Sequence, residues 1–260
     1  MIVDELAESV ISLVSGAEVT DWCVCLRHAY VEVMIDGDRY LGVALVPHED
    51  VHGVRAPLRE PSLEALGVMV SSPNPIDKVL GVALINAVSS YLIKRDGFTD
   101  ELPEIADEVP ALLISRRVRS VLVIGNMAPL VRRLREAGMT VYVTERNPAA
   151  RWGGAYPDTS FVRLAGRVRA AVITGATLVN DTLDYLLPML TYAYKVLVGP
   201  TAGAYPPSLA PRYVDAVASM VVDDVDAVKR VLRLGGGRWD FSKYCTQYIY
   251  APPSYLDELL

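Results

Sequence analysis

In the second half of the chain, short apolar runs alternate with amphipathic stretches, and this alternation restricts the fold more than any other feature. The runs predict strands over 120–124, 140–144, 170–174, 195–198 and 215–221, and the stretches predict helices over 128–137, 182–192 and 224–234. Strands that alternate with helices join through right-handed crossovers into a parallel sheet. We therefore predict an α/β fold with a Rossmann-like domain over residues 101–260.

The first hundred residues show a different pattern, which predicts a smaller α+β domain. We expect a helix over 2–15, a strand over 22–35 bent near 27–29, a hairpin turn at Asp36-Gly37, a return strand over 40–46, and helices over 63–70 and 75–95. The stretch 97–110 is acidic and punctuated by prolines. It predicts a boundary between a domain of residues 1–100 and a domain of residues 101–260.

Composition limits the setting of the protein and its partners. Asp4 and Glu5 are wrong for the positive start of a signal peptide, and the longest uncharged apolar stretch, Val79–Ile93, has 15 residues where a membrane span needs about 20. We therefore expect a buried helix there and a cytoplasmic protein with no membrane partner. The net charge of −6 argues against nucleic acid as a partner, and a homodimer stays an open option.

Amide and thiol side chains are both rare. The chain has five Asn and one Gln, and 20 Arg against 5 Lys. Depletion of labile amides is typical of a thermophilic source, although genome composition produces the same bias. Three cysteines without an export signal argue against a disulfide framework. Cys23 and Cys25 share one face of a predicted strand, where they either pair with Cys245 or, more commonly, pack as core residues.

Polar or glycine-containing turns follow four of the predicted strands, and the carboxyl ends of parallel strands share one edge of the sheet. Glycine lets a ligand approach the backbone, and helix N-termini offer N–H groups to anions, so this edge is a candidate binding site. Each turn taken alone also suits a plain strand-to-helix connection. The candidate ligand contacts in these turns are Gly125, Asn126, Glu145, Asn147, Thr174, Gly175, Thr177, Asn180, Gly199, Pro200 and Thr201.

The first of these turns differs from the dinucleotide fingerprint. It has one glycine, Gly125, where G-x-G-x-x-G has three, which disfavours a standard NAD site. Glu145 lies 20 residues further on, where a carboxylate accepts hydrogen bonds from ribose hydroxyls. A nucleoside-type cofactor such as S-adenosylmethionine, bound as in Rossmann-like methyltransferases, therefore stays an alternative, as does a solvated acid at the strand end.

Several of these polar residues have a structural interpretation as well. Asp181 is expected to cap the helix that follows it, whereas Thr174 and Thr177 are expected to contact a ligand. Asn86 lies in the middle of the apolar helix and needs a hydrogen-bond partner, either a backbone group or a ligand at the domain interface. No nucleophile–base pair stands out, so whether the protein is an enzyme is left open.

The segment His48–His52 spells H-E-x-x-H, which on a long helix places two imidazoles on one face for zinc. Pro47 before it and Gly53 after it predict no two-turn helix, so a zinc hydrolase is disfavoured. His48 and His52 remain candidates for a metal site in a loop.

Three segments together resemble the heavy-metal-chelation family of bacterial and archaeal proteins. They are Pro75–Leu92 with its Gly81-Val82-Ala83 and Asn86-Ala87, Thr174–Leu183 with the sequence TGATLVNDTL, and Gly199-Pro200-Thr201. The resemblance covers nearly the whole chain. It implies an enolase-N-terminus-like domain followed by a Rossmann-like domain, with a site in the cleft between them. One departure is the first turn, where the family has an aromatic residue and proline after the glycine and this chain has Gly125-Asn126-Met127-Ala128-Pro129.

The resemblance also implies a role in handling metals, or chemistry on pterin-, flavin- or siderophore-like chelators. It makes Asn86 a candidate cleft residue, because Asn86 lies in a matching helix. The leading hypothesis is a protein that binds a small polar, metal-chelating ligand between its domains, with a metal ion or a nucleoside-type molecule as the cofactors to consider. The alternatives are an enzyme that uses S-adenosylmethionine and a non-catalytic metal-binding module.

Overall fold

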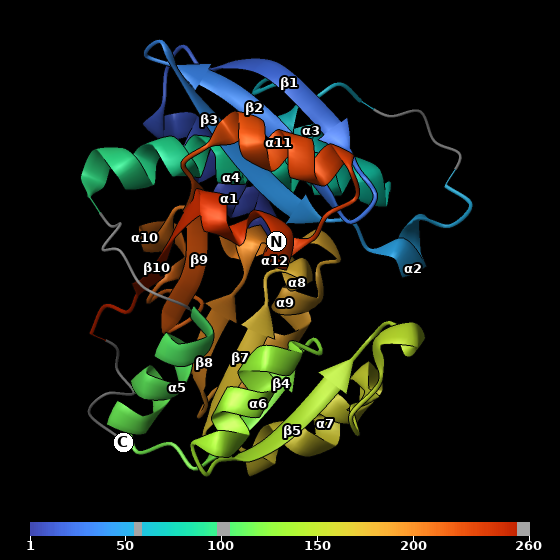
Figure 1. The fold of residues 1–260 in the computed structure, drawn as a ribbon, viewed down its shortest axis with the longest axis vertical. Coiled ribbons are helices and arrows are strands. Elements are labelled where there is room, and N and C mark those ends of the chain that lie inside the picture. The colour runs from blue at the N-terminus through green and yellow to red at the C-terminus, as the bar shows by residue number, and fades with distance from the viewer. Residues whose placement is uncertain (55–58, 98–104, 254–260) are drawn as a thin grey trace.

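The computed structural model describes residues 1–54, 59–97 and 105–253, and it contains two sheets (Figure 1). The smaller sheet is antiparallel, with the order β1-β2-β3, and the larger has seven strands in the order β10-β9-β8-β7-β4-β5-β6. In the larger sheet only the edge strand β10 is antiparallel to its neighbour. The predicted α/β fold, with a Rossmann-like sheet after a smaller α+β region, is confirmed. The boundary at residue 100 stays a prediction.

The smaller sheet is built from β1 (Glu18–Val24), β2 (His28–Ile35) and β3 (Asp38–Leu45), with α1 (Ile2–Leu13), α2 (His48–Val51), α3 (Leu66–Val70) and α4 (Pro75–Asp96) around it. The hairpin turn at Asp36-Gly37 is confirmed, with φ angles of 54° and 87°. The expectation of one bent strand over 22–35 was wrong. Residues 25–27 make a full turn, so that Cys23 pairs with Tyr30 and Val24 with Ala29 in antiparallel register.

The helix α4 is the centre of this part of the molecule, and it is buried as predicted. It is the one helix among the described residues that is long and apolar enough to span a membrane, and 83% of its most apolar window is buried inside the protein. It packs directly on β3 at Gly42, where an added Cβ would lie 2.1 Å from the Ala83 carbonyl oxygen. Only glycine permits this approach of helix and sheet.

The larger sheet follows the predicted alternation. Its strands are β4 (Ser120–Ile124), β5 (Thr140–Glu145), β6 (Tyr156–Pro157), β7 (Ala170–Thr174), β8 (Tyr194–Val198), β9 (Ala216–Val222) and β10 (Cys245–Tyr250). Its helices are α5 (Ile105–Ser115), α6 (Ala128–Glu136), α7 (Phe161–Leu164), α8 (Ala176–Val179), α9 (Thr182–Leu186), α10 (Pro206–Leu209), α11 (Val225–Arg233) and α12 (Arg238–Phe241). The chain runs outward from β4 through β5 to β6, and then outward from β7 in the other direction, so the strand order reverses between β4 and β7.

Two predictions for this half need correction. The stretch 97–110 is not wholly a connection, because α5 begins at Ile105 and includes Pro110, while residues 98–104 lie outside the described part of the chain. The helix expected over 182–192 ends at Leu186 and continues as a 3-10 helix, Leu187–Leu190. Pro188 explains the change, since proline cannot donate the backbone hydrogen bond that an α-helix needs.

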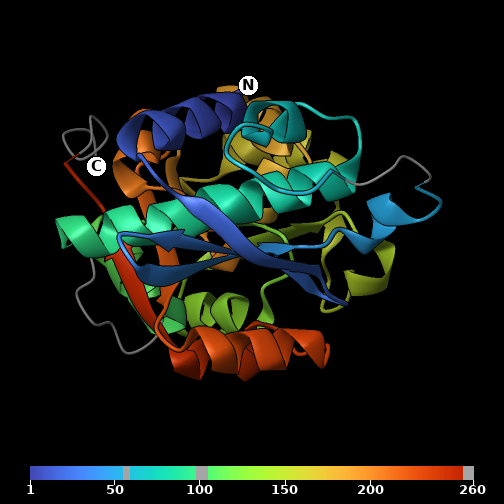
Figure 2. The same ribbon diagram turned by 90° about the horizontal axis from the view of Figure 1, so that it is seen from above.

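The two halves of the sequence pack against each other. Seen from above, the three-stranded sheet lies between α4 on one side and α11, from the second half of the chain, on the other (Figure 2). One apolar cluster combines Tyr30 and Leu41 of this sheet with Val228 and Leu232 of α11. Because of these contacts, side chains from both halves meet at the carboxyl ends of the parallel strands.

Candidate functional site

A cavity of about 560 Å³ opens at the carboxyl ends of β4, β5 and β7. Leu45 and Glu49 from the first half of the chain line it together with residues of the parallel sheet. The cavity therefore lies where the strand order reverses, and in open α/β sheets this is the place where ligands bind. Six of the predicted contacts line it: Gly125, Asn126, Glu145, Thr174, Thr177 and Asn180.

The first lining turn shows why glycine follows β4. Gly125 has a φ angle of +92°, and a Cβ built on it would lie 2.9 Å from Cγ2 of Thr174. A left-handed backbone and this close contact both require glycine. Gly125 therefore lets the ends of β4 and β7 stay close together at the floor of the site.

Glu145 ties two turns together. Its Oε2 accepts a hydrogen bond from the Asn126 backbone N–H at 2.7 Å, and its Oε1 accepts one from the Asn147 N–H at 2.8 Å. The Met127 N–H bonds back to the Gly125 carbonyl, and Pro129 near the start of α6 has no N–H. The N–H groups of Gly125, Asn126 and Met127 are therefore all bonded within the protein. The expectation that this turn holds no standard NAD site stays a prediction.

The two asparagines near Glu145 also bond to the backbone. The Asn126 side-chain amide donates to the carbonyl oxygens of Ala150 at 2.8 Å and Trp152 at 3.1 Å, which fixes the loop after β5. Asn147 caps the 3-10 helix Pro148–Ala150 by accepting from the Ala149 N–H, and it does not line the cavity. A role of Asn147 in ligand binding stays a prediction.

The segment after β7 is held by its own hydroxyls. Thr177 Oγ1 donates to the Thr174 carbonyl oxygen at 2.7 Å, and Thr182 Oγ1 donates to Asn180 Oδ1 at 2.6 Å. The expected capping by Asp181 was wrong, because its side chain makes no cap hydrogen bond. Asp181 instead has a left-handed backbone, with φ of 59°, and its carboxylate pairs with the Lys78 ammonium of α4.

The structure does not bring the remaining predicted residues to this cavity: Asn86, Gly175, Gly199, Pro200 and Thr201. They join the two halves of the molecule instead. Asn86 Nδ2 donates to the Val43 carbonyl oxygen at 2.9 Å and to the Thr201 carbonyl oxygen at 3.2 Å, and Thr201 Oγ1 accepts from the Leu45 N–H at 3.0 Å. A Cβ on Gly175 would lie 2.3 Å from the Ala202 nitrogen, so this glycine allows close packing.

Other lining residues were missed from the sequence. Glu49, Arg146, Asp158, Phe161 and Tyr185 all line the cavity. Arg146 follows Glu145 directly, so its position in the same turn was a usable signal, and its guanidinium pairs with Asp50 of α2 at 2.8 Å. The other four come from short helices whose place beside the sheet no local pattern indicates.

The histidine and cysteine candidates lie elsewhere. His48 and His52 are exposed at the two ends of α2, which is a single turn, as the flanking proline and glycine predicted. Within residues 1–54, 59–97 and 105–253, no three His, Cys, Asp or Glu side chains are grouped to hold a metal ion. The expectation that Cys23 and Cys25 pack as core residues or pair with Cys245 was wrong, because they are bonded to each other and Cys245 is free.

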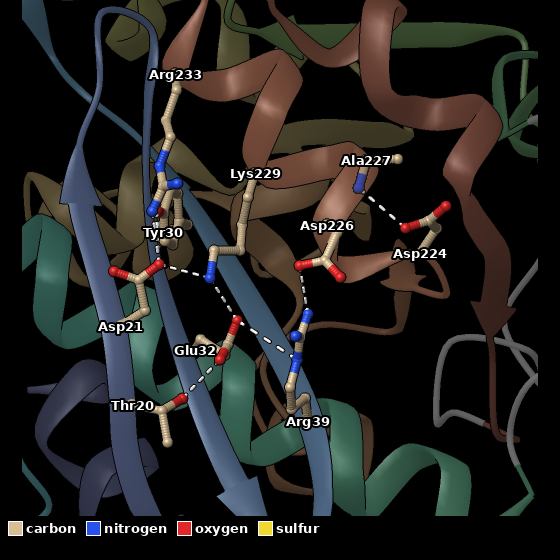
Figure 3. Close-up of polar contacts among 10 residues, drawn as sticks. All are labelled: Thr20, Asp21, Tyr30, Glu32, Arg39, Asp224, Asp226, Ala227, Lys229 and Arg233. Atoms are coloured by element: carbon tan, nitrogen blue, oxygen red, sulfur yellow. Dashed lines mark hydrogen bonds and ion pairs between the residues drawn. The ribbon is translucent and has the colours of Figure 1, made fainter.

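A second polar assembly lies between the three-stranded sheet and α11 (Figure 3), and we call it the charged cluster. The Lys229 ammonium contacts Asp21 at 2.5 Å and Glu32 at 2.7 Å, and Arg233 contacts Asp21 at 2.7 Å. Burial acts to raise the pKa of Asp21, but hydrogen bonds from Lys229 and Tyr30 outweigh it and lower that pKa. Burial acts to lower the pKa of Lys229, and its bonds to the two carboxylates raise it.

Comparison with known proteins places the chain in a family. Residues 111–251 match the model of the DUF364 family and residues 4–89 match that of the DUF4213 family, both described as "Putative heavy-metal chelation". An uncharacterized protein of Methanocaldococcus jannaschii is 32% identical over 257 residues, which are 95% of this chain and 97% of that protein.

Two solved structures are similar over nearly their full lengths. A DUF364 protein of unknown function from Pyrococcus horikoshii is 30% identical with a TM-score of 0.85, covering 96% of this chain and 100% of that one. A DUF364 protein from Desulfitobacterium hafniense has the same fold at 20% identity, with a TM-score of 0.76 and coverage of 96% and 98%. The expected family resemblance is confirmed: the chain belongs to the DUF364 family, to which a role in heavy-metal chelation is ascribed.

Proposed function

We propose that the cavity at the carboxyl ends of β4, β5 and β7 binds a small, polar, metal-chelating molecule of the pterin, flavin or siderophore type. The observation that carries this proposal is the position of the cavity at the reversal of strand order, with both halves of the chain contributing to its wall. The family description supports a role connected with metals. As a separate point, the archaeal relatives support the thermophilic source that the scarcity of Asn and Gln suggests.

The size and lining of the cavity suit a ring system with polar edges. Its volume of about 560 Å³ lies within the range of about 300–1,000 Å³ that small-molecule sites occupy. Phe161, Val162 and Tyr185 supply an apolar wall from α7 and α9. Thr174 at the end of β7 and Thr177 of α8 supply oxygens. Flat heteroaromatic molecules pack on such a wall and direct their carbonyl and hydroxyl groups to the polar side chains.

Charged groups at the cavity favour a cation carried by the ligand. Glu49, Glu145 and Asp158 contribute three carboxylates, of which Asp158 lies 3.8 Å from the Arg151 guanidinium. Among the described lining residues the one guanidinium is that of Arg146, and it is paired with Asp50. Hard metal ions prefer oxygen ligands. We infer that a chelator brings its own donor atoms for the metal, and that the cavity carboxylates stabilise the positive charge of the complex.

The direct test is to identify, by mass spectrometry, any small molecule that purifies with the protein. Flavin mononucleotide, 6-carboxypterin and ferric 2,3-dihydroxybenzoate are then titrated by fluorescence or absorbance. The matched variants are Val162→Trp, which fills the cavity, and Val68→Trp on α3; each valine is 53% exposed, and only Val162 lines the cavity. We expect Val162→Trp to weaken binding about tenfold or more and Val68→Trp to leave it unchanged.

Two results would contradict this proposal. One is that no molecule purifies with the protein and none of the three probes binds. The other is that Val162→Trp binds a probe as tightly as the unchanged protein does. Elemental analysis of the purified protein, repeated with His48→Ala and His52→Ala, tests separately whether these two histidines retain a metal by themselves.

Glu145 supports a second candidate, an enzyme that uses S-adenosylmethionine. It lies at the end of the second parallel strand and lines the cavity, where a carboxylate accepts hydrogen bonds from ribose hydroxyls. Both of its oxygens already accept one backbone N–H, and each retains a second lone pair. Micromolar binding of S-adenosylmethionine in calorimetry, abolished by Glu145→Ala and kept by Glu8→Ala, would favour this candidate, provided that both variants melt as one transition.

A further inference from the structure

The opposite end of the parallel sheet contains a second hollow. It has a volume of about 470 Å³ and lies where β4, β7 and β8 begin, lined among others by Ser120, Arg167, Arg169 and Tyr192. The strands point toward the three-stranded sheet, so their starts lie at the far end of the molecule from it (Figure 1). This hollow is therefore separate from the proposed chelator site.

Hydrogen bonds between neighbouring strands gather arginines around this hollow. The Arg169 N–H donates to the Ser120 carbonyl oxygen at 3.0 Å, which sets the residue before β7 beside the start of β4 and its preceding Arg119. The guanidinium of Arg116 lies 4.5 Å from the centre of the Tyr194 ring at the start of β8. Five arginines from two segments thus come to one end of the sheet: Arg116, Arg117, Arg119, Arg167 and Arg169.

Long segments of the chain that reach this end contain no acidic residue, and Asp215, directly before β9, is paired with Lys195 at 3.0 Å. The sequence has no Asp or Glu in 109–135, in 159–180 or in 185–214, although the whole chain carries a net charge of −6. Among the described residues, no carboxylate lies within ion-pair distance of Arg167 or Arg169. The acidic balance of the chain is therefore an average, and the positive charge is concentrated at the starts of β4 and β7.

The side chains present here are those that recognise nucleotides. Guanidinium groups bind phosphate oxygens through two parallel hydrogen bonds, and an exposed aromatic ring stacks on a base. Tyr192 lines the hollow and is 78% exposed, with its ring available for such stacking. We propose that this end of the sheet binds single-stranded nucleic acid, with one base in the hollow against Tyr192 and its phosphates on Arg167, Arg169 and the arginines before β4.

Fluorescence anisotropy with a labelled single-stranded RNA of about 12 nucleotides, at about 50 mM salt, tests the proposal. We expect the RNA to bind, and the logarithm of its association constant to fall linearly with the logarithm of the salt concentration, with a slope of about −0.7 for each phosphate contacted. The double variant Arg167→Glu/Arg169→Glu should weaken binding about tenfold or more. The control Arg27→Glu/Arg230→Glu changes two exposed arginines at the other end of the molecule and lowers the net charge by the same four units. It should bind nearly as the unchanged protein does.

Tyr192→Ala provides a second test that removes no charge. Its ring is exposed, so we expect normal folding, about tenfold weaker binding of the RNA and unchanged binding of inorganic polyphosphate. The proposal is overturned if the RNA does not bind at about 50 mM salt, or if the two double variants lose affinity equally, which would show only the effect of net charge. Binding of polyphosphate or AMP without binding of the RNA would also overturn it, as a site for small anions alone.

Discussion

The charged cluster beneath α11 and the cavity at the ends of β4, β5 and β7 are both built from polar side chains, yet they use them differently. In the charged cluster, Lys229 is 12% exposed and lies between Asp21 and Glu32, so the charges neutralise one another. In the cavity, Glu145 and Thr177 bond to their own turns and still face about 560 Å³ of open volume. Polar groups with unused bonding capacity beside open volume therefore mark the candidate site, and pairing alone does not.

This difference between the charged cluster and the cavity also predicts how much each region contributes to the stability of the fold and to ligand binding. The charged cluster connects β1 and β2 to α11, which come from opposite halves of the sequence, so we expect it to stabilise the docking of the two halves. The cavity lining makes few contacts of this kind, so changes there should alter ligand binding more than folding. Changes in the free energy of unfolding test this comparison.

The largest effect is expected from Lys229→Met. Removing the ammonium leaves Glu32, which is 5% exposed on its side chain, with only Arg39 at 3.8 Å as a positive partner, whereas Asp21 keeps Arg233 at 2.7 Å. Breaking a buried ion pair on one side costs about 3–5 kcal/mol, and we expect the lower value because Thr20 still donates to Glu32. Urea denaturation measures the loss. The control is Arg230→Met on the exposed side of α11, which should change stability by no more than about 0.5 kcal/mol.

The stability of the protein at acidic pH is expected to depend on His28. Its ring packs edge-on against Phe241, close to the contact between the three-stranded sheet and α11. Burial, with the charges of Arg27 and His48, lowers the pKa of His28 to about 4 from an ordinary value of 6.5. The unfolded chain then binds the proton more readily, so stability is full above pH 6.5 and falls as the pH drops toward 4. The loss is on the order of 3 kcal/mol.

Unfolding of His28→Phe against pH checks this, because phenylalanine keeps a ring against Phe241 and cannot take up a proton. We expect the fall between pH 6.5 and 4 to be largely removed. The lowered pKa of Asp21 contributes stability above its ordinary value of 3.8 that is lost only below it, so a loss confined to pH values under 4 is assigned to the charged cluster. An unchanged fall in His28→Phe would contradict the role of the histidine.

A smaller effect is expected beside the cavity from Gly175→Ala. The new Cβ would lie 2.3 Å from the Ala202 backbone nitrogen, so the turn after β8 must move. We expect a loss of about 2 kcal/mol. Gly166→Ala is the control, since nothing lies within 4 Å of a Cβ there, and it should leave stability unchanged or raise it by up to about 1 kcal/mol. Equal losses in the two variants would contradict the packing role of Gly175.

The comparison of the two regions also shows which features of the fold and of the candidate site can be predicted from the sequence. The alternation of strands and helices predicts the parallel sheet, because its period is a local property of the chain. It also predicts that Gly125, Glu145 and Thr174 meet, because the carboxyl ends of parallel strands share one edge. The disulfide of Cys23 and Cys25 was missed, because the turn over 25–27 was taken as a bend in one strand.

Features that depend on how the two halves pack could not be predicted in this way. Asn86 and Thr201 have the polar character of ligand contacts, and the structure uses them to hydrogen-bond one half to the other. Glu49 and Tyr185 line the cavity although they belong to short helices far apart in the sequence. Their positions follow from tertiary packing, for which the local periodicity of a sequence contains no signal.

The smallest effect is expected at the rim of the cavity, from Arg146→Gln. The Arg146–Asp50 pair joins the two halves as the charged cluster does, but its side chains are 37% and 24% exposed, so water screens the attraction. Pairs of this kind contribute about 0–1 kcal/mol, and we expect a loss within that range in urea denaturation. Arg133→Gln, which removes a similarly exposed pair with Asp107 on α5 and α6, should cost about the same. A loss near 3 kcal/mol for Arg146→Gln alone would mean that the ion pair at the rim stabilises the fold as strongly as the charged cluster does. It would contradict the comparison, in which the charged cluster stabilises the fold and the cavity binds a ligand.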